Sequence, residues 1–266
     1  MVYFAPEAAA SYARLGLEGQ SGYFASRAAP MGAVGAGTII ATFYNFRPEL
    51  VRRSMDGVWE RVDPAAVLEA RSGAAGDALR RMLADAAGSD DLRTAADLAR
   101  RAALRACERT EGRPLFAGHA DLPWPDGPVE TLWHAQSLLR EFRGDGHIAL
   151  LVDHGIDGIE ALVLHEATGD LPMSLLRETR GWSDEEWSDA ATRLRDRGWL
   201  RPAGTAERLV LSDEGAGVRT AIEEATDRLA VFAYEALGDV ECERLRGLVR
   251  PMSRAVVAAS GLGGVA

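Results

Sequence analysis

The chain has 266 residues, 47% of them hydrophobic, a composition typical of a globular protein and not of a disordered one. Its formal net charge of −10 leaves no general basic surface for phosphates, so DNA binding would need positive charge concentrated on one element. No run of about 18 or more apolar residues occurs, so no membrane-spanning helix is expected. The N-terminus lacks a basic start followed by an apolar stretch, so we expect no signal peptide and a cytoplasmic protein.

The two cysteines, Cys107 and Cys242, lie far apart in apolar helical patterns. A reducing cytosol favours two buried free thiols over a structural disulfide, although the sequence leaves both open. All 30 basic residues are arginines.

The first half of the chain is predicted to be a series of helices. Asp63 followed by Pro64 is a typical helix start, and Ser89 is a second candidate N-cap. After them, a glycine- and proline-rich stretch predicts a stiff, irregular loop over 112–128. The predicted helices are a first one starting at Pro6, then 21–29, 36–46, one opening at Pro48, and two long ones over 63–86 and 89–109.

The second half is predicted to contain a winged helix-turn-helix unit. Ser183 and Glu186 have the spacing of a capping box, and Gly181-Trp182 provides the turn before it. Because helix, turn, helix, two short strands and a long helix follow one another, the order is that of a winged helix. The predicted helices are 128–142, 147–153 (after a break at 144–146), 158–167, 171–179, 183–197, 213–237 and 241–259, with strands over 199–201 and 208–212.

The expected fold class is therefore mainly α, with a multi-helix N-terminal region over 1–127 and a winged-helix region with a small two-stranded wing over 128–266. Within the second region, MSLLRETRGWSDEEWSDAATRLRDRGWL (173–200) and LSDEGAGVRTAIEEATDRL (211–229) resemble MarR-like regulators. The whole chain resembles an actinobacterial helix-turn-helix family, and that name describes a fold and not an activity. The motifs that carry this second resemblance are YFAPEA (3–8), GLEGQ (16–20), GYFASRAAPMG (22–32), ATFYNFRPEL (41–50), LPWPDGP (122–128) and LWHAQSLLREFRGDGHIALLV (132–152).

In such regulators the N-terminal part of the second helix enters the major groove and offers donors to bases and phosphates. Here that part carries four carboxylates in seven residues, Asp184, Glu185, Glu186 and Asp189. Acids in a first turn also complement the helix dipole, which explains their presence without restoring affinity for DNA. We therefore do not expect this helix to read DNA.

Polar and aromatic side chains on helices otherwise patterned for burial suggest a small-molecule pocket. The candidate ligand-binding residues are Tyr23, Arg27, Phe43, Asn45, Trp124 and Arg140, with Tyr44, His134 and His147 as candidate acid–base catalysts. A buried Arg27 would need an anion, which an internal carboxylate or an acidic ligand would supply. Plain core packing is the alternative for the N-terminal set, and a salt-bridged helix end for the segment 140–147, in which Asp145 would orient His147.

No metal site is expected, because no two of the five histidines have a ligand-pair spacing, and no cofactor is expected either. The function that fits these features is a winged-helix-derived protein that binds a hydrophobic small molecule, either for sequestration or as a cofactor-independent cyclase or dehydratase. The alternative is a ligand-responsive MarR-like transcriptional regulator. A hydrophobic small molecule is the expected partner; DNA and membranes are not, and a homodimer is left open.

Overall fold

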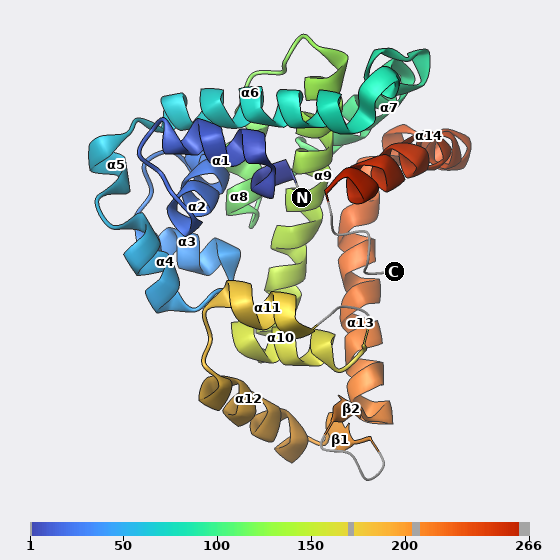
Figure 1. Cartoon of the computed structure of the whole chain (residues 1–266). Helices are drawn as coiled ribbons and strands as arrows, with labels where there is room; N and C mark the ends of the chain where they lie inside the picture. Colours follow the sequence, from blue (N-terminus) through green and yellow to red (C-terminus); the bar gives the residue numbers. More distant parts are fainter. Residues whose placement is uncertain (1, 170–172, 204–207, 261–266) are drawn as a thin grey trace.

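A computed structural model describes residues 2–169, 173–203 and 208–260. Within these ranges the chain is mainly helical and has one small two-stranded antiparallel sheet, which confirms the expected fold class. Figure 1 shows the long helix α9 running down the middle of the molecule, with α13 beside it. Helices α6 and α7 lie across one end, and α12 and the strands lie at the other.

The N-terminal half forms the predicted helices, because their start signals are local. The Asp63 side chain accepts a hydrogen bond from the backbone N–H of Ala65, and Ser89 accepts one from Leu92. The elements are η1 Val2–Phe4, α1 Pro6–Ala13, α2 Gln20–Ala28, η2 Ala29–Met31, α3 Ala36–Phe43, α4 Pro48–Met55, α5 Val58–Arg61, α6 Pro64–Leu83, η3 Ala84–Gly88 and α7 Asp90–Ala106.

Two expectations in the middle of the chain were wrong. The segment predicted as a loop contains helix α8, Pro114–Ala120, and helix α9 runs unbroken through Pro128–Asp153. Each interior glycine of α9 costs about 1 kcal/mol in helix propensity, but α9 is packed against α7, α8 and α13. Tertiary packing therefore outweighs the break predicted at 144–146.

The winged-helix order is present, and the predicted capping box between Ser183 and Glu186 is formed. The two strands pair in the register Leu200↔Leu211, and the start of the predicted helix 171–179 and residues 204–207 lie outside the described residues. The elements are α10 Gly158–Glu166, α11 Met173–Arg180, α12 Asp184–Asp196, β1 Leu200–Pro202, β2 Leu209–Leu211, α13 Asp213–Ala230, η4 Val231–Ala236 and α14 Gly238–Ala259.

The largest hydrophobic core brings together both halves of the sequence. Leu92 of α7 and Leu138 of α9 share it with Phe232 of η4 and Leu245 of α14. The winged unit has a second core around Trp187. Buried side chains from both sides of the predicted boundary between residues 127 and 128 therefore pack in one core. The two-region division at that boundary stays a prediction.

Cys107 and Cys242 are free thiols, as favoured, although each is half-buried and not fully buried. Both pack at the edge of the largest core. Burial, with a smaller contribution from Asp121, raises the pKa of the Cys107 thiol, which makes this thiol less reactive at neutral pH.

Candidate functional site: a cavity between the N-terminal helices and the winged unit

A cavity of about 520 Å³ lies where α2 and α3 face α9, α10 and α13. Small-molecule sites in proteins usually measure about 300–1,000 Å³ and combine apolar walls with a few polar groups. This cavity fits both criteria. Its lining includes seven of the nine candidate residues, namely Tyr23, Arg27, Phe43, Tyr44, Asn45, Arg140 and His147.

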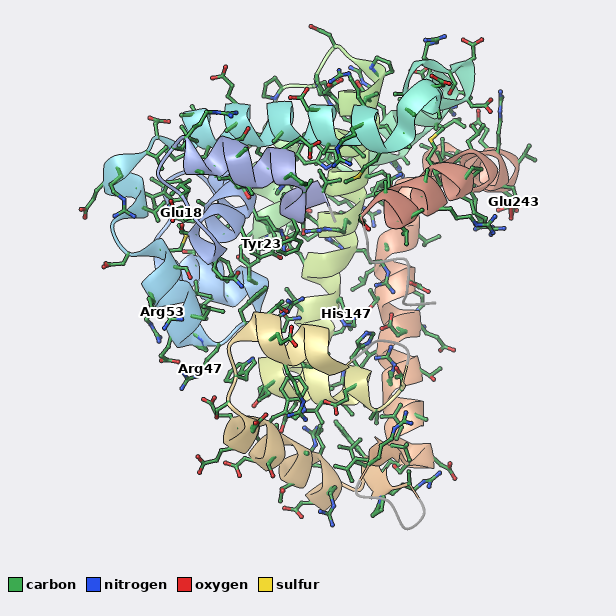
Figure 2. The ribbon with its side chains drawn as sticks, in the orientation of Figure 1. Glu18, Tyr23, Arg47, Arg53, His147 and Glu243 are labelled. Carbon is green, nitrogen blue, oxygen red and sulfur yellow. The ribbon has the colours of Figure 1, made fainter. Side chains whose placement is uncertain are left out.

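An aromatic wall forms one side of the cavity. The ring of Tyr23 lies 5.7 Å from that of Phe46 and 6.5 Å from that of Phe43. Phe43 ends α3 and Phe46 follows three residues later, so the turn after α3 presents both rings to α2. Figure 2 labels Tyr23 on this wall and His147 on the helix below it.

Arg27 is paired with an internal carboxylate. Its Nη2 donates to both carboxylate oxygens of Glu141, at 3.0 and 3.2 Å, and its Nη1 donates to the Tyr23 hydroxyl at 2.8 Å. Burial alone would raise the pKa of Glu141, but the charges of Arg27 and Arg140 outweigh it and hold this pKa at about 2. The sequence left open whether an internal carboxylate or an acidic ligand supplies the anion for Arg27. The structure shows the internal carboxylate, and the cavity lies beside this ion pair.

Arg140 and Arg180 complete the positive charge of this region. Arg140 donates to the same Glu141 carboxylate at 2.5 Å. Arg180, at the end of α11, has its guanidinium carbon 4.5 Å above the Phe46 ring and donates to the Thr179 hydroxyl at 2.6 Å. Its buried Nε has no hydrogen-bond partner, and no carboxylate of the described residues forms an ion pair with it.

The segment 44–47 contacts the cavity and the helix-turn-helix turn at once. Tyr44 has a left-handed backbone (φ 30°), and its hydroxyl donates to the Ile156 carbonyl. The Asn45 carbonyl accepts from the Trp182 ring at 3.0 Å, and the Arg47 side chain pairs with Glu186 at 2.9 Å. The first turn of α12 is thereby fastened to the segment that lines the cavity.

His147 makes a different contact from the one expected. Its Nδ1 lies 2.9 Å from the Thr226 hydroxyl, while Asp145 accepts from the backbone N–H of Phe116 at 2.9 Å. The expectation that Asp145 orients His147 was therefore wrong, because the unpredicted helix α8 occupies that carboxylate. Burial raises the pKa of Asp145 to about 6 and lowers that of His147.

Trp124 and His134 do not line this cavity. Their rings pack edge to face at 4.8 Å, and the buried Nε2 of His134 has no partner. Burial, with Arg71 nearby, lowers the pKa of His134 to about 4. Because α9 is continuous, His134 lies about 20 Å along the helix from His147, too far for one site.

A buried polar cluster around Arg71, next to Arg27, was missed. Arg71 is 3% exposed, donates to the Tyr3 hydroxyl at 2.9 Å and lies 3.0 Å from His119 Nε2. Burial, together with Arg71, lowers the pKa of His119 to about 3, so this ring is neutral and accepts the hydrogen bond. An arginine on the apolar side of a predicted helix was the one available signal for this cluster.

The exposed face of α12 is acidic, as its sequence indicated. Asp184, Glu185 and Asp189 are exposed, whereas Glu186 is half-buried through its contact with Arg47. Arg193, later on the same helix, is paired with Asp157 and Glu160 at 2.8 and 2.9 Å. The charge that this helix presents to a binding partner is therefore mainly negative.

Across the described part of the chain, no group of three or more His, Cys, Asp or Glu side chains is placed to hold a metal ion. In the same residues, no helix is both long and apolar enough to cross a membrane.

Fold and site together define a helix-turn-helix protein with a wing and a cavity beside the turn. The chain belongs to a helix-turn-helix family whose model matches residues 1–263. No curated protein and no solved structure matches it.

Proposed function

We propose that the chain is a small-molecule-binding protein built on a helix-turn-helix fold, with its ligand in the cavity between α2, α3, α9, α10 and α13. The observation that carries the proposal is the cavity itself, about 520 Å³ with an aromatic wall and a few placed polar groups. A buried polar atom without a partner costs about 1–3 kcal/mol, and the Nε atoms of Arg27 and Arg180 are two such atoms at this cavity, which favours a site where water or a ligand satisfies them.

Binding without turnover is favoured over the cyclase or dehydratase that the sequence also suggested. Such an enzyme needs an acid and a base aimed at its substrate. The Tyr44 hydroxyl is committed to the Ile156 carbonyl, and His147 is hydrogen-bonded to Thr226. His134, the third candidate, lies outside the cavity lining.

Filling the cavity from α9 tests the proposal. A Cβ added at Gly144 would meet only Glu141, at 3.8 Å, and leucine is a better helix former than glycine by about 1 kcal/mol. Gly144→Leu should therefore abolish binding of the fluorescent neutral probe N-phenyl-1-naphthylamine without lowering the melting temperature. Gly73→Leu is the matched control, because Gly73 is an exposed glycine of α6 with open space around it.

Equal probe binding by the wild type and by Gly144→Leu would refute the proposal, since the probe would then sit elsewhere. The apolar groove between α6, α7, α9 and α14, lined by Leu79 and Met252 among others, is the place it would occupy.

A ligand-responsive transcriptional regulator is the second candidate. Two observations favour it: α12 and the strands lie at the end of the molecule away from α6 and α7, and segment 44–47 joins the cavity to the turn before α12 (Figure 1). The acidic face of α12, however, favours a protein that does not act through DNA. We therefore propose the small-molecule-binding protein and not the regulator.

A further inference from the structure

The arginines around the cavity outnumber the carboxylates that neutralise them. Arg27 and Arg140 share the single carboxylate of Glu141, and Arg180 has no carboxylate partner among the described residues. At the other end of the cavity the charges balance, because two carboxylates, Glu223 and Asp227, pair with Arg143 at 2.7 and 3.0 Å. The charge of Arg219, which also lines this end, helps to lower the pKa of Glu223. The excess positive charge is thus local to the aromatic wall.

The neighbouring cluster adds to this excess. The guanidinium carbons of Arg27, Arg71 and Arg140 lie 6.0, 5.6 and 5.9 Å from the centre of the Tyr3 ring. Asp145 also lines the cavity, but its carboxylate accepts from the Phe116 N–H and pairs with none of these arginines. Desolvating a charge without a counter-charge is costly, so a region where Glu141 is, within the described part of the chain, the one ion-pair partner of these guanidinium groups favours a further anion. Burial lowers the pKa of Arg180, and the charge of Arg27 adds to this against an opposing contribution from Tyr23, which agrees with a guanidinium that lacks a carboxylate partner.

We infer that the ligand of the cavity is an organic acid, whose anionic group binds Arg180 and whose apolar body lies against Tyr23, Phe43 and Phe46. This inference rests on the proposed function. The guanidinium of Arg180 stands 4.5 Å above Phe46, so an anion bound there is next to the aromatic wall. A small inorganic anion would leave that wall and most of the 520 Å³ unused, and a cationic ligand would be repelled.

A matched pair of probes separates charge from apolar fit. The anionic probe 8-anilinonaphthalene-1-sulfonate has the same rings as N-phenyl-1-naphthylamine and differs from it by one sulfonate. Arg180→Gln should weaken binding of the sulfonate about tenfold or more, the loss expected for a charge-assisted hydrogen bond. The same substitution should leave binding of the neutral probe unchanged.

Arg177→Gln is the control, since it removes the same charge from the same helix at a residue outside the cavity lining. Arg180→Lys keeps the charge and should retain most of the sulfonate affinity. In the wild type, salt should weaken binding of the sulfonate and leave the neutral probe unaffected. Because the salt dependence is measured on the wild type, it does not depend on whether a variant folds.

The outcomes distinguish the two proposals. If Arg180→Gln and salt change neither probe while Gly144→Leu abolishes both, the cavity binds small molecules and the inference of an organic acid is overturned. If Gly144→Leu changes neither probe, the proposed function itself fails. Selective loss of the sulfonate in Arg180→Gln, with both probes lost in Gly144→Leu, supports both.

Discussion

Glu141 is the residue on which the charge balance beside the cavity depends, because it is the shared partner of Arg27 and Arg140. Glu141→Gln leaves a buried guanidinium without its anion and should lower the free energy of unfolding by about 3–5 kcal/mol. Its folded pKa of about 2 lies below the unfolded value, so the carboxylate stabilises the fold above about pH 4.5 and loses that contribution as the pH falls toward 2.

Urea titrations between pH 3 and pH 7 measure this effect. The difference between the wild type and Glu141→Gln should shrink as the pH falls through this window. A pH-independent difference would contradict the charge account. The double variant with Arg27→Met should recover much of the stability, because it removes the buried charge that Glu141 neutralises.

The contribution of Asp145 to stability depends on pH in the opposite direction to that of Glu141. The folded pKa of Asp145, about 6, lies above the unfolded value, so folding favours the protonated acid, and its ionisation destabilises the fold as the pH rises from about 4 to 6. Asp145→Asn keeps an oxygen to accept from the Phe116 N–H and removes the buried charge. It should stabilise the protein by about 1–3 kcal/mol at pH 8 and by almost nothing at pH 4.

Thermal or urea unfolding at the two pH values checks this prediction. Asp145→Ala, which also removes the acceptor, should destabilise at both. A stabilisation by Asp145→Asn that is equally large at pH 4 would mean that charge is not its cause.

At the scale of elements, sequence predicted those helices whose signals are local. The caps at Asp63, Ser89 and Ser183 lie within a few residues of the groups they bind, so spacing alone located the helix starts. Helix α8 and the continuity of α9 were missed, because packing against distant segments decides both.

The residues of the candidate site likewise divide into those that the sequence indicates and those that only the fold brings together. Tyr23 and Arg27 were recognised because each is a polar side chain on a helix otherwise patterned for burial. Glu141 is 114 residues from Arg27, so its ion pair with Arg27 could not be predicted. Arg180 drew no attention in the sequence, because only the fold brings it beside Phe46.

The acidic turn of α12 belongs to the element scale as well. The side chain of Asp184 is 96% exposed, whereas that of Glu186 is only 33% exposed because it contacts Arg47. Asp184→Arg with Glu186→Arg removes the capping box and the Arg47 contact, so we expect an intact fold that is less stable by about 1–2 kcal/mol.

The control Glu185→Arg with Asp189→Arg makes the same change of charge on the same exposed helix without touching a cap. Circular dichroism melting should show a clearly smaller loss for this control. Equal losses would mean that the net charge of the helix, and not its cap and its contact with Arg47, sets the stability.

At the scale of the whole molecule, the net charge of −10 and the acidic face of α12 predict weak DNA binding. Polarisation titrations at about 150 mM salt against the chain's own upstream region should give no submicromolar, sequence-dependent dissociation constant, whereas specific DNA binders fall well below that level. Glu185→Arg with Asp189→Arg should bind DNA more tightly than the wild type. Tight, specific binding by the wild type would instead establish the regulator.

The central claim is that the cavity between the N-terminal helices and the winged unit holds a small molecule. A crystal structure of the full chain with 8-anilinonaphthalene-1-sulfonate tests it most directly. We expect density for the rings against Tyr23, Phe43 and Phe46, with the sulfonate at Arg180. A cavity that contains only water, with the probe in the groove beside α14 or on the surface, would contradict the account.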